Sequence, residues 1–522
     1  MPVSAGKRGW GGLATGGCVV GLLIALAALF AVTSSAHAAT NANCPPIANK
    51  PGSIPHVNYN GVKHITYCAG PITVNPGQNV IRLNGTNLFP QQPGYITRFD
   101  PELVYTNGKV PRVDVLHLHH AVWVVNGKPQ FAVGEEKTIV QAPQGFGWRT
   151  RPSDHWFLND MLHDLVGKSA QVYIVWRVDF VPDTAPAAAN MKTVRTQWMD
   201  VSGPSPRVGV SSPIYPVFNS LRRYGTNGKY TFPDQAPPDQ RDLIGDNQTW
   251  VPDHPVTILQ TAGHLHPGGL NTRLTVRRGA KTNTLFTSRA HYYEPAGEVS
   301  WDVAMGATPP SWRVKLKAGD KLGVHATYDT RRADWYEVMG IMPVAVYNGT
   351  NVGGVDAMSS QISQDSVLTH GHLAENNHHG GGPTSMPNPL ALPDGPFPSS
   401  AVNIQGYLYS QGDLHQSGAA GRPPTIHAGQ SVTFKNLDDA QSNTWHTITG
   451  CKLPCNRDTG IAYPIANGPR TFDSGQLGTN APFNAPAIGK ITWKTPKNLS
   501  AGTYSYFCRV HPFMRGSFRV KP

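Results

Sequence analysis

Three side chains that bind soft metals are concentrated in one short carboxy-terminal loop. Cys508, His511 and Met514 form a C-x2-H-x2-M pattern. The loop follows a strand-like run that ends at Phe507 and precedes another over residues 516–520, so a thiolate, an imidazole and a thioether can face one point. A buried free thiol beside incidental histidines is the alternative interpretation.

A further imidazole must come from a neighbouring strand, and the alternating run over residues 443–448 supplies His446. Two histidines and a cysteine in one plane, with a weak axial methionine, form the ligand set of electron-transfer copper. Thiolate and thioether suit Cu(I) and imidazole tolerates Cu(II), so a preformed loop leaves little reorganisation between the two states. We therefore expect a type-1 copper site made of His446, Cys508, His511 and Met514.

The carboxy-terminal region resembles the cupredoxins, the blue copper proteins related to amicyanin and plastocyanin, and its short ligand loop is most similar to that of amicyanin. The resemblance covers residues 401–522 and includes the segments 426–434 and 499–504. It implies a Greek-key β-sandwich that carries single electrons.

Two further histidine clusters lie upstream, one at His119 and His120 and the other at His264 and His266. Residues two apart on a strand share a face, so His264 and His266 can both reach one metal ion. His119 and His120 are adjacent, and they can serve one ion only if the backbone bends between them.

These upstream segments resemble the copper type II, ascorbate-dependent monooxygenases, the family of peptidylglycine monooxygenase and dopamine β-monooxygenase. The likeness spans about residues 70–348 and implies two tandem β-sandwiches. In that family a His-x-His pair and a later methionine hold the copper that meets dioxygen. The resemblance assigns this role to His264, His266 and Met339, with Met342 as the alternative methionine.

The sequence also departs from that family at two positions. Asp179 stands where the resemblance places the third histidine of the electron-transfer site, so the second copper site is expected at His119, His120 and Asp179. The arginine that grips a peptide carboxylate in the family is replaced by Ala262, which argues against a peptidylglycine substrate. The alternative sources of the missing imidazole are His117, His155 and His163.

Two functions fit these motifs. In the first, the chain is an O2-dependent copper monooxygenase, an oxidoreductase that acts on a small-molecule substrate. Its cupredoxin receives electrons from a redox partner protein or a small reductant and serves the upstream copper site. In the second, it is a non-catalytic copper-binding or electron-carrier protein. A multicopper oxidase is a third interpretation, but its trinuclear centre needs several His-x-His pairs, and the Cys508 loop has only His511 nearby.

The composition indicates an all-β protein. The chain contains 54 Gly and 46 Pro, with short Val/Ile/Thr/Tyr-rich runs and almost no long helical periodicity. The net charge of +12 is scattered rather than gathered in a basic block, so nucleic-acid binding is not expected. The expected parts are a signal peptide at 1–38, a monooxygenase-like sandwich at 39–205, a second one at 206–350, a Gly/Pro/His-rich linker at 351–400 and the cupredoxin sandwich at 401–522.

The amino terminus is typical of a secretory signal. Lys7 and Arg8 precede an apolar run over residues 19–32, and Ala36-His37-Ala38 is a small-x-small cleavage signature. An uncleaved anchor is the alternative, but the run is short for a bilayer span. We therefore expect a secreted or periplasmic protein with no membrane span after cleavage.

Disulfides persist in such an oxidising compartment. Cys18 leaves with the signal, and the remaining cysteines suggest two bridges and one odd thiol, Cys508, whose presence a metal would explain. The expected disulfide pairs are Cys44 with Cys68 and Cys451 with Cys455.

Overall fold

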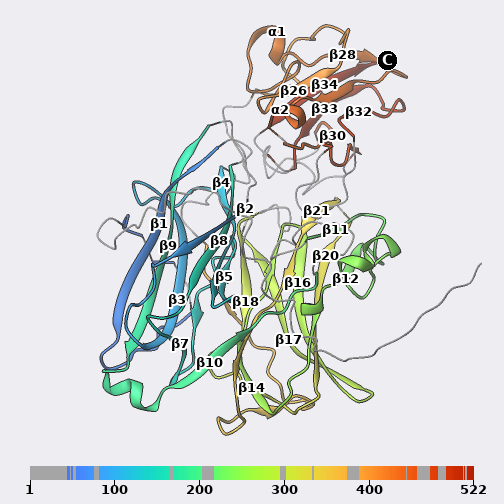
Figure 1. Cartoon of the computed structure of the whole chain (residues 1–522). Helices are drawn as coiled ribbons and strands as arrows, with labels where there is room; N and C mark the ends of the chain where they lie inside the picture. The colour runs from blue at the N-terminus through green and yellow to red at the C-terminus, as the bar shows by residue number, and fades with distance from the viewer. Residues whose placement is uncertain are drawn as a thin grey trace, which may run out of the picture. The chain divides into compact units, whose positions relative to one another are not determined.

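Strands dominate the computed structural model, and the predicted all-β fold class is confirmed (Figure 1). The predicted signal peptide lies outside the described residues. In the described part of the chain, helical structure is limited to α1 (Gly418–Gly421), α2 (Asp438–Ser442), η2 (Pro186–Asn190), η4 (Pro238–Leu243) and η5 (Asp246–Gln248). The residues that the structure describes are 44–47, 49–50, 54–75, 81–113, 115–164, 168–202, 217–293, 301–331, 334–372, 387–442, 444–454, 471–479, 490–509, 511 and 514–522.

One ten-stranded sheet runs through both predicted upstream sandwiches. The two halves join where β10 pairs antiparallel with β23, from Val194 opposite Tyr347 to Gln197 opposite Val344. A shared sheet holds side chains from the two halves in a fixed relation, because its backbone hydrogen bonds cross the junction. In spatial order the strands are β1 (Lys63–Val74), β9 (Ala170–Pro182), β3 (Gly94–Tyr105), β7 (Phe146–Thr150), β10 (Lys192–Gln197), β23 (Val344–Tyr347), β14 (Val256–Thr261), β19 (Val314–Leu316) and β24 (Val355–Asp356), with β6 (Val140–Gln141) paired to β3.

Smaller sheets complete the upstream region. The first has the order β2 (Ile81–Thr86), β8 (Trp156–Asp164), β4 (Leu116–Val125), β5 (Lys128–Val133). The second has the order β12 (Lys229–Phe232), β20 (Lys321–Asp329), β16 (Gly269–Arg278), β17 (Lys281–Tyr292), β18 (Val303–Ala307), β25 (Val367–Leu368), with β13 (Thr249–Trp250) paired to β20. Two strand pairs are β11 (Phe218–Ser220) with β21 (Trp335–Val338) and β15 (His264–Leu265) with β22 (Gly340–Ile341).

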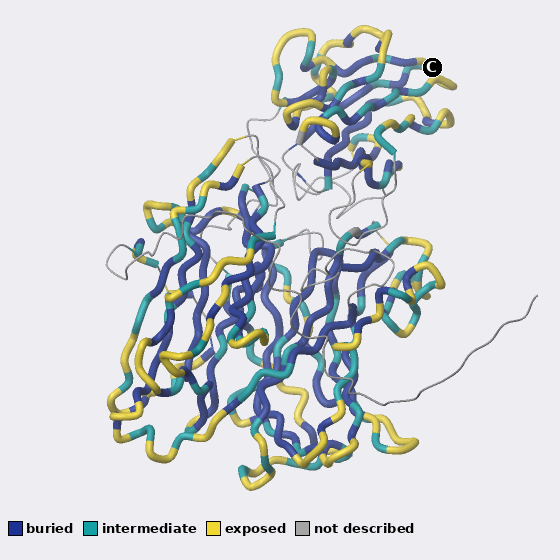
Figure 2. The backbone as a smooth tube through the Cα atoms, viewed as in Figure 1, coloured by how far each residue is buried: buried dark blue, intermediate teal, exposed yellow. Residues whose placement is uncertain are grey.

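Aromatic side chains fill the core between β3, β9, β4 and β5. Phe99 stacks on Phe131 with ring centres 4.2 Å apart, and Trp123 meets the Phe99 ring edge-on at 4.6 Å. Such contacts add about 0.5–1.5 kcal/mol per pair to the burial of the rings. Figure 2 shows the buried strands as continuous dark blue stretches, with the exposed residues mostly in the connections. The strands that carry the upstream histidines therefore stand on a packed support.

Part of the predicted linker belongs to the upstream sheets. The short strand β24 pairs in parallel with β19, and β25 pairs antiparallel with β18. The Gly, Pro, Ser and His content of residues 351–400 did not predict this pairing, because two-residue strands are held by backbone groups and leave little pattern in the side chains.

The carboxy-terminal region forms two facing sheets with a core of their own around Phe434, Tyr506 and Phe518. Strand β33 pairs antiparallel with β34 up to Phe507 opposite Arg515. The turn between these two strands is the loop that carries the predicted metal ligands. The first sheet contains β27 (Leu408–Tyr409), β26 (Val402–Gln405), β29 (Thr433–Asn436) and β32 (Thr492–Lys494), and the second contains β28 (Thr425–His427), β34 (Arg515–Lys521), β33 (Gly502–Phe507), β30 (Thr449–Lys452) and β31 (Phe472–Asp473).

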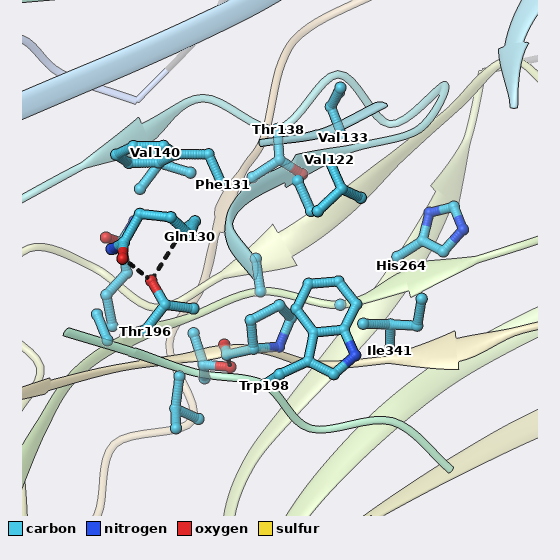
Figure 3. A pocket seen from close by; sticks show the side chains of 18 of the residues that line it. Val122, Gln130, Phe131, Val133, Thr138, Val140, Thr196, Trp198, His264 and Ile341 are labelled. Atoms are coloured by element: carbon cyan, nitrogen blue, oxygen red, sulfur yellow. Dashed lines mark hydrogen bonds between the residues drawn. The ribbon is translucent and has the colours of Figure 1, made fainter. Parts of the chain in front are cut away.

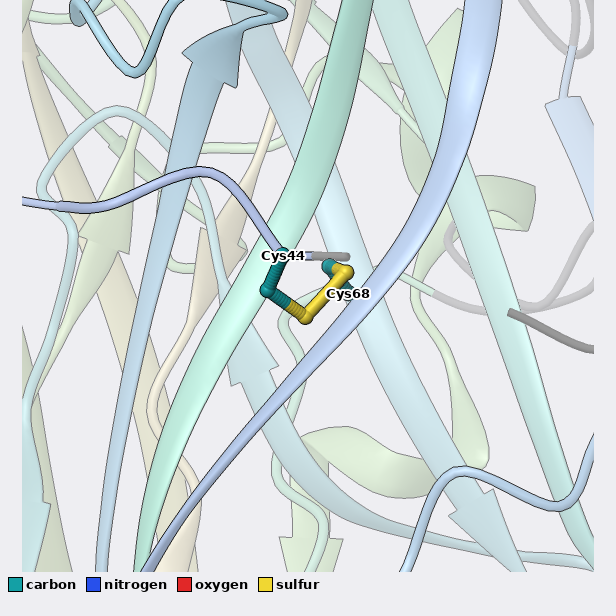
Figure 4. The surroundings of a disulfide bond; sticks show 2 residues. All are labelled: Cys44 and Cys68. Atoms are coloured by element: carbon teal, nitrogen blue, oxygen red, sulfur yellow. A yellow bond between two sulfur atoms is a disulfide. The ribbon is translucent and has the colours of Figure 1, made fainter. Parts of the chain in front are cut away.

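The first predicted disulfide is confirmed, since Cys44 and Cys68 are bonded (Figure 4). It ties the amino-terminal segment to β1. Cys451 is also disulfide-bonded, and its expected partner Cys455 lies outside the described residues.

Replacing Cys44 and Cys68 by Ser should lower the free energy of unfolding by about 3 kcal/mol, because opening a loop of this length restores chain entropy to the unfolded state. Urea denaturation of both single variants and the double variant measures this. The two single losses should not add, since each substitution removes the same bond. Additive losses, or an unchanged midpoint, would contradict a structural role for this bridge.

Candidate metal centres

Three donor atoms meet where β33 ends. Cys508 Sγ lies 3.7 Å from His446 Nδ1 and 3.7 Å from His511 Nδ1, and the two nitrogens are 3.1 Å apart. All three residues are buried. In the part of the chain that the structure describes, this trio is a candidate metal site, with its ligand atoms all within 4.8 Å of one another.

The backbone fixes this trio in place. The Met514 N–H donates to the His511 carbonyl at 2.9 Å, which closes the turn between β33 and β34. The backbone N–H groups of Thr447 and His511 donate to Cys508 Sγ at 3.3 and 3.4 Å. Hydrogen bonds of this kind orient a sulfur ligand and tune the potential of a metal bound to it.

Asp438 orients the His446 ring. Its Oδ2 lies 3.0 Å from His446 Nε2, so the Nδ1 atom of that ring is turned toward Cys508. The backbone N–H groups of Gly406 and Tyr407 also donate to the Asp438 carboxylate, at 2.6 and 3.1 Å. A carboxylate behind a histidine ligand fixes the ring orientation and raises its basicity.

The two imidazoles hold the thiol in its ionised form. Burial would raise the pKa of Cys508, but its contacts with His446 and His511 lower that pKa well below its ordinary value. For His446, burial lowers the pKa, whereas Asp438 and the thiolate raise it, to about 9 on balance. Thiolate is the form of cysteine that binds metals, so the site is prepared for a cation.

Apolar and aromatic groups enclose the trio. The Tyr407 ring meets His446 and His511 edge-on, with ring centres 5.6 and 5.0 Å apart. Met514 is fully buried and belongs to the same core cluster as Cys508. The structure thus brings all four predicted carboxy-terminal residues into one buried region, and the donor set of two imidazoles and a thiolate favours copper.

The backbone bend required for the upstream pair is present in β4. Leu118 faces Leu162 on β8, whereas His120 faces Met161, so His119 is the extra residue of a β-bulge. The bulge brings His119 Nδ1 to 3.3 Å from His120 Nδ1.

The imidazole on β8 closest to His119 is that of His163, and His117 lies farther away on the same strand as His119. The ring centre of His163 lies 4.6 Å from that of His119 and 4.9 Å from that of His117. An imidazole nitrogen sits about 2 Å from a bound metal, which separates ring centres around one ion by about 4.5–5.5 Å. The two imidazoles of the carboxy-terminal trio are 4.9 Å apart by the same measure. His163 therefore has the spacing of a shared metal site with His119 and with His117, whereas the ring centres of His117 and His119 are 6.4 Å apart, beyond that spacing.

Burial favours the neutral form of these upstream histidines by lowering their pKa. Burial, and then the charges of neighbouring imidazoles, hold the pKa of His119 and of His163 well below the ordinary value. Burial lowers the pKa of His117 to about 3. Neutral imidazole is the form that binds metals. His163 Nε2 is buried and has no hydrogen-bond partner among the described residues.

The His-x-His pair lies on β15 and just after it. His264 Nδ1 is 2.8 Å from Glu136 Oε2, and this contact orients the ring. The other ring nitrogen, Nε2, is buried and has no partner among the described residues. Met339 is buried and lines the same cavity as His264. His266 lies beside His264 with ring centres 5.4 Å apart, and still closer to His119, at 4.5 Å. The two predicted upstream sites therefore adjoin each other.

The structure places the remaining candidates elsewhere. Asp179 contacts His64 Nδ1 at 2.6 Å and His56 Nδ1 at 3.1 Å, so its carboxylate is engaged by imidazoles other than the predicted pair. Strand pairing causes this, because β9 sets Asp179 opposite His64 on β1. His155 is exposed, and Met342 packs in the core of the second half of the upstream region.

Comparisons with known proteins leave the chain without an assigned family. No protein-family model and no curated protein matches the sequence. Three solved structures are similar only at low TM-scores: the PBCV-1 virus capsid (8% identity, 56% of this chain and 95% of that chain, TM-score 0.23), the Cu-containing nitrite reductase from Thermus scotoductus SA-01 (12%, 51% and 55%, 0.14) and the infectious bursal disease virus Gx strain (10%, 62% and 82%, 0.17). TM-scores this low do not define a shared fold, so these similarities assign no function.

Asp438→Asn should weaken Cu(II) binding at the carboxy-terminal site by about 10- to 100-fold, because the amide orients His446 without the carboxylate charge. Competition with a chelator measures the affinity. Asp439→Asn is the matched control, since that carboxylate bonds to Thr479 instead. Equal losses in the two variants would contradict a specific role for Asp438.

Gly134→Ala should remove one equivalent of bound metal from the upstream region. A methyl group there would lie 2.5 Å from His264 Cε1 and 2.8 Å from Glu136 Oε2, so the ring and its anchor must shift. Elemental analysis of the purified variant measures the metal content. In the control Gly85→Ala the added carbon meets nothing closer than 3.8 Å, and the content should not change. Full metal content in Gly134→Ala would argue against His264 as a ligand.

Proposed function

We propose that this chain is a copper protein whose carboxy-terminal region is a cupredoxin with a type-1 copper site. The observation that carries the proposal is the convergence of His446 Nδ1, Cys508 Sγ and His511 Nδ1 within 3.7 Å in a buried place. These residues fit the metal, because a trigonal His2Cys set with a weak axial methionine is the donor set of electron-transfer copper. Met514 is the axial candidate.

Bound copper would supply a one-electron couple between Cu(II) and Cu(I). The chain's residues keep that couple reversible. Asp438 holds the His446 ring in one orientation. The backbone N–H groups of Thr447 and His511 donate to Cys508 Sγ and fix the position of the sulfur. Tyr407 and the surrounding core exclude water. A site that changes little between two oxidation states exchanges electrons at small reorganisation cost.

For the upstream region we propose an O2-dependent copper monooxygenase site at His264, His266 and Met339, served by the cupredoxin. The fit rests on the buried Nε2 atoms of His264 and His266, which have no partner among the described residues. For the second copper we propose His119 and His163, whose ring centres are 4.6 Å apart, in place of a site that includes Asp179. The balanced reaction is R–H plus O2, two electrons and two protons giving R–OH and water.

The two electrons would come one at a time from a redox partner protein or a small one-electron reductant. The protein residues bind and orient in this scheme: Glu136 holds His264 through Nδ1, and burial keeps the other rings neutral. The alternative is a non-catalytic carrier in which only the carboxy-terminal site exchanges electrons. That alternative is favoured by the missing third family histidine at Asp179.

We also propose a secreted or periplasmic location. Its support is the Cys44–Cys68 disulfide, which persists in oxidising surroundings. Over the residues described, no helix is both long enough and apolar enough to cross a bilayer.

A copper count combined with electron paramagnetic resonance tests these proposals. Wild-type protein should show one blue type-1 signal and additional type-2 copper. Cys508→Ala should lose only the blue signal, and His264→Ala only part of the type-2 signal. His155→Ala, an exposed histidine, is the matched control and should lose neither. A blue signal alone would favour the carrier, and a colourless copper-loaded protein would contradict the cupredoxin proposal.

A further inference from the structure

A cavity lies next to two of the proposed oxygen-site ligands. The cavity has a volume of about 90 Å³ and is lined by residues from both halves of the upstream region, including His264 and Met339 (Figure 3). Figure 3 shows the His264 ring at one end of the cavity and the Gln130–Thr196 pair at the other. A molecule in this space would therefore lie beside the His264 imidazole.

Apolar side chains make most of the wall. Val122 and Val133 approach from β4 and β5, Trp198 follows β10, and Ile341 and Val344 come from β22 and β23. Apolar cavities stay dry and favour apolar occupants, because water there would lack hydrogen-bond partners.

Most of the polar groups of the wall are already paired with protein. The Thr196 hydroxyl donates to the Gln130 carbonyl at 2.8 Å and accepts from Trp148 Nε1 at 3.0 Å. The Thr261 hydroxyl donates to the Pro343 carbonyl at 2.8 Å. An exception is Gln260 Oε1, which has no partner among the described residues and can accept a single hydrogen bond.

Charge is almost absent from the wall. The described lining contains no Lys or Arg, and its one carboxylate, Glu136, is bound to His264 Nδ1 and to the Gly134 N–H. An anionic substrate would find no Lys or Arg in the described lining, and a cationic one would have to compete with His264 for Glu136. Burial of an unpaired charge costs several kcal/mol, so the lining favours an uncharged molecule.

We propose that this cavity binds a small, uncharged, apolar molecule and that this molecule is the substrate of the upstream copper site. The inference rests on the proposed monooxygenase function for its reaction, in which a C–H bond of the bound molecule becomes C–OH by the balanced equation above. The volume of the cavity limits the size of the bound molecule. An apolar cavity of about 150 Å³ accepts benzene or xenon, so a cavity of about 90 Å³ suits a molecule of a few heavy atoms, such as a short alkane or alkene.

The binding step is tested with xenon, which needs neither copper nor turnover. Crystals of the full chain pressurised with xenon should show an anomalous peak in this cavity. Val122→Phe should abolish the peak by filling the space, and Val124→Phe is the matched control, a buried valine on the same strand that does not line the cavity. Absence of the peak from the wild-type protein would overturn the inference without reference to any variant.

The substrate class is tested on copper-loaded protein with ascorbate as reductant. Propane or propene should raise oxygen uptake several-fold and yield an alcohol, whereas acetate and ethylamine, which are close to them in size, should not. Equal stimulation by the charged compounds would overturn the inference and leave the monooxygenase function standing. A xenon peak with no stimulated uptake by any compound would refute the monooxygenase function and the substrate role, while the cavity would remain an apolar binding site.

Discussion

The carboxy-terminal structure depends on one constraint. It must hold several electron-rich donor atoms close together in a buried site from which water is excluded. A thiolate and two imidazole nitrogens lie within 3.7 Å of one another, and burial removes the water that would otherwise solvate the negative charge. Such a group is costly unless a cation or a proton is shared within it. Three features hold the donor atoms in that arrangement: the two sheets, the Asp438 carboxylate bonded to His446, and the backbone N–H groups that donate to Cys508 Sγ.

The upstream region depends on a different structural feature, the sheet that its two halves share. The pairing of β10 with β23 joins the two halves in one sheet, and β4 and β15, which carry the histidines, belong to smaller sheets, one in each half. Imidazoles from the two halves therefore meet, as the 4.5 Å separation of His119 and His266 illustrates. In the proposed enzyme, this contact would let the two upstream coppers lie close together, and the apolar cavity, which His120 also lines, would place substrate beside His264.

The sequence predicted the local features well and the long-range ones poorly. The fold class followed from composition and strand-like runs, and the Cys508 loop followed from spacing, since its ligands lie within seven residues. Asp438 and Glu136 were missed, because each acts only through its contact with a histidine, His446 or His264, to which no local pattern links it. Asp179 was expected beside His119 and instead pairs across β1 with His64, a register that no local pattern contains. Among His117, His155 and His163, only the folded structure shows that His155 is exposed and that His163 lies closest to His119.

The central claim is that Cys508, His446 and His511 bind one copper ion together. X-ray absorption at the copper edge of the protein loaded with a single equivalent tests it most directly. The account predicts one short copper–sulfur bond with two nitrogen neighbours, and its loss in Cys508→Ser. A spectrum fitted by nitrogen and oxygen neighbours alone, unchanged by that substitution, would contradict it.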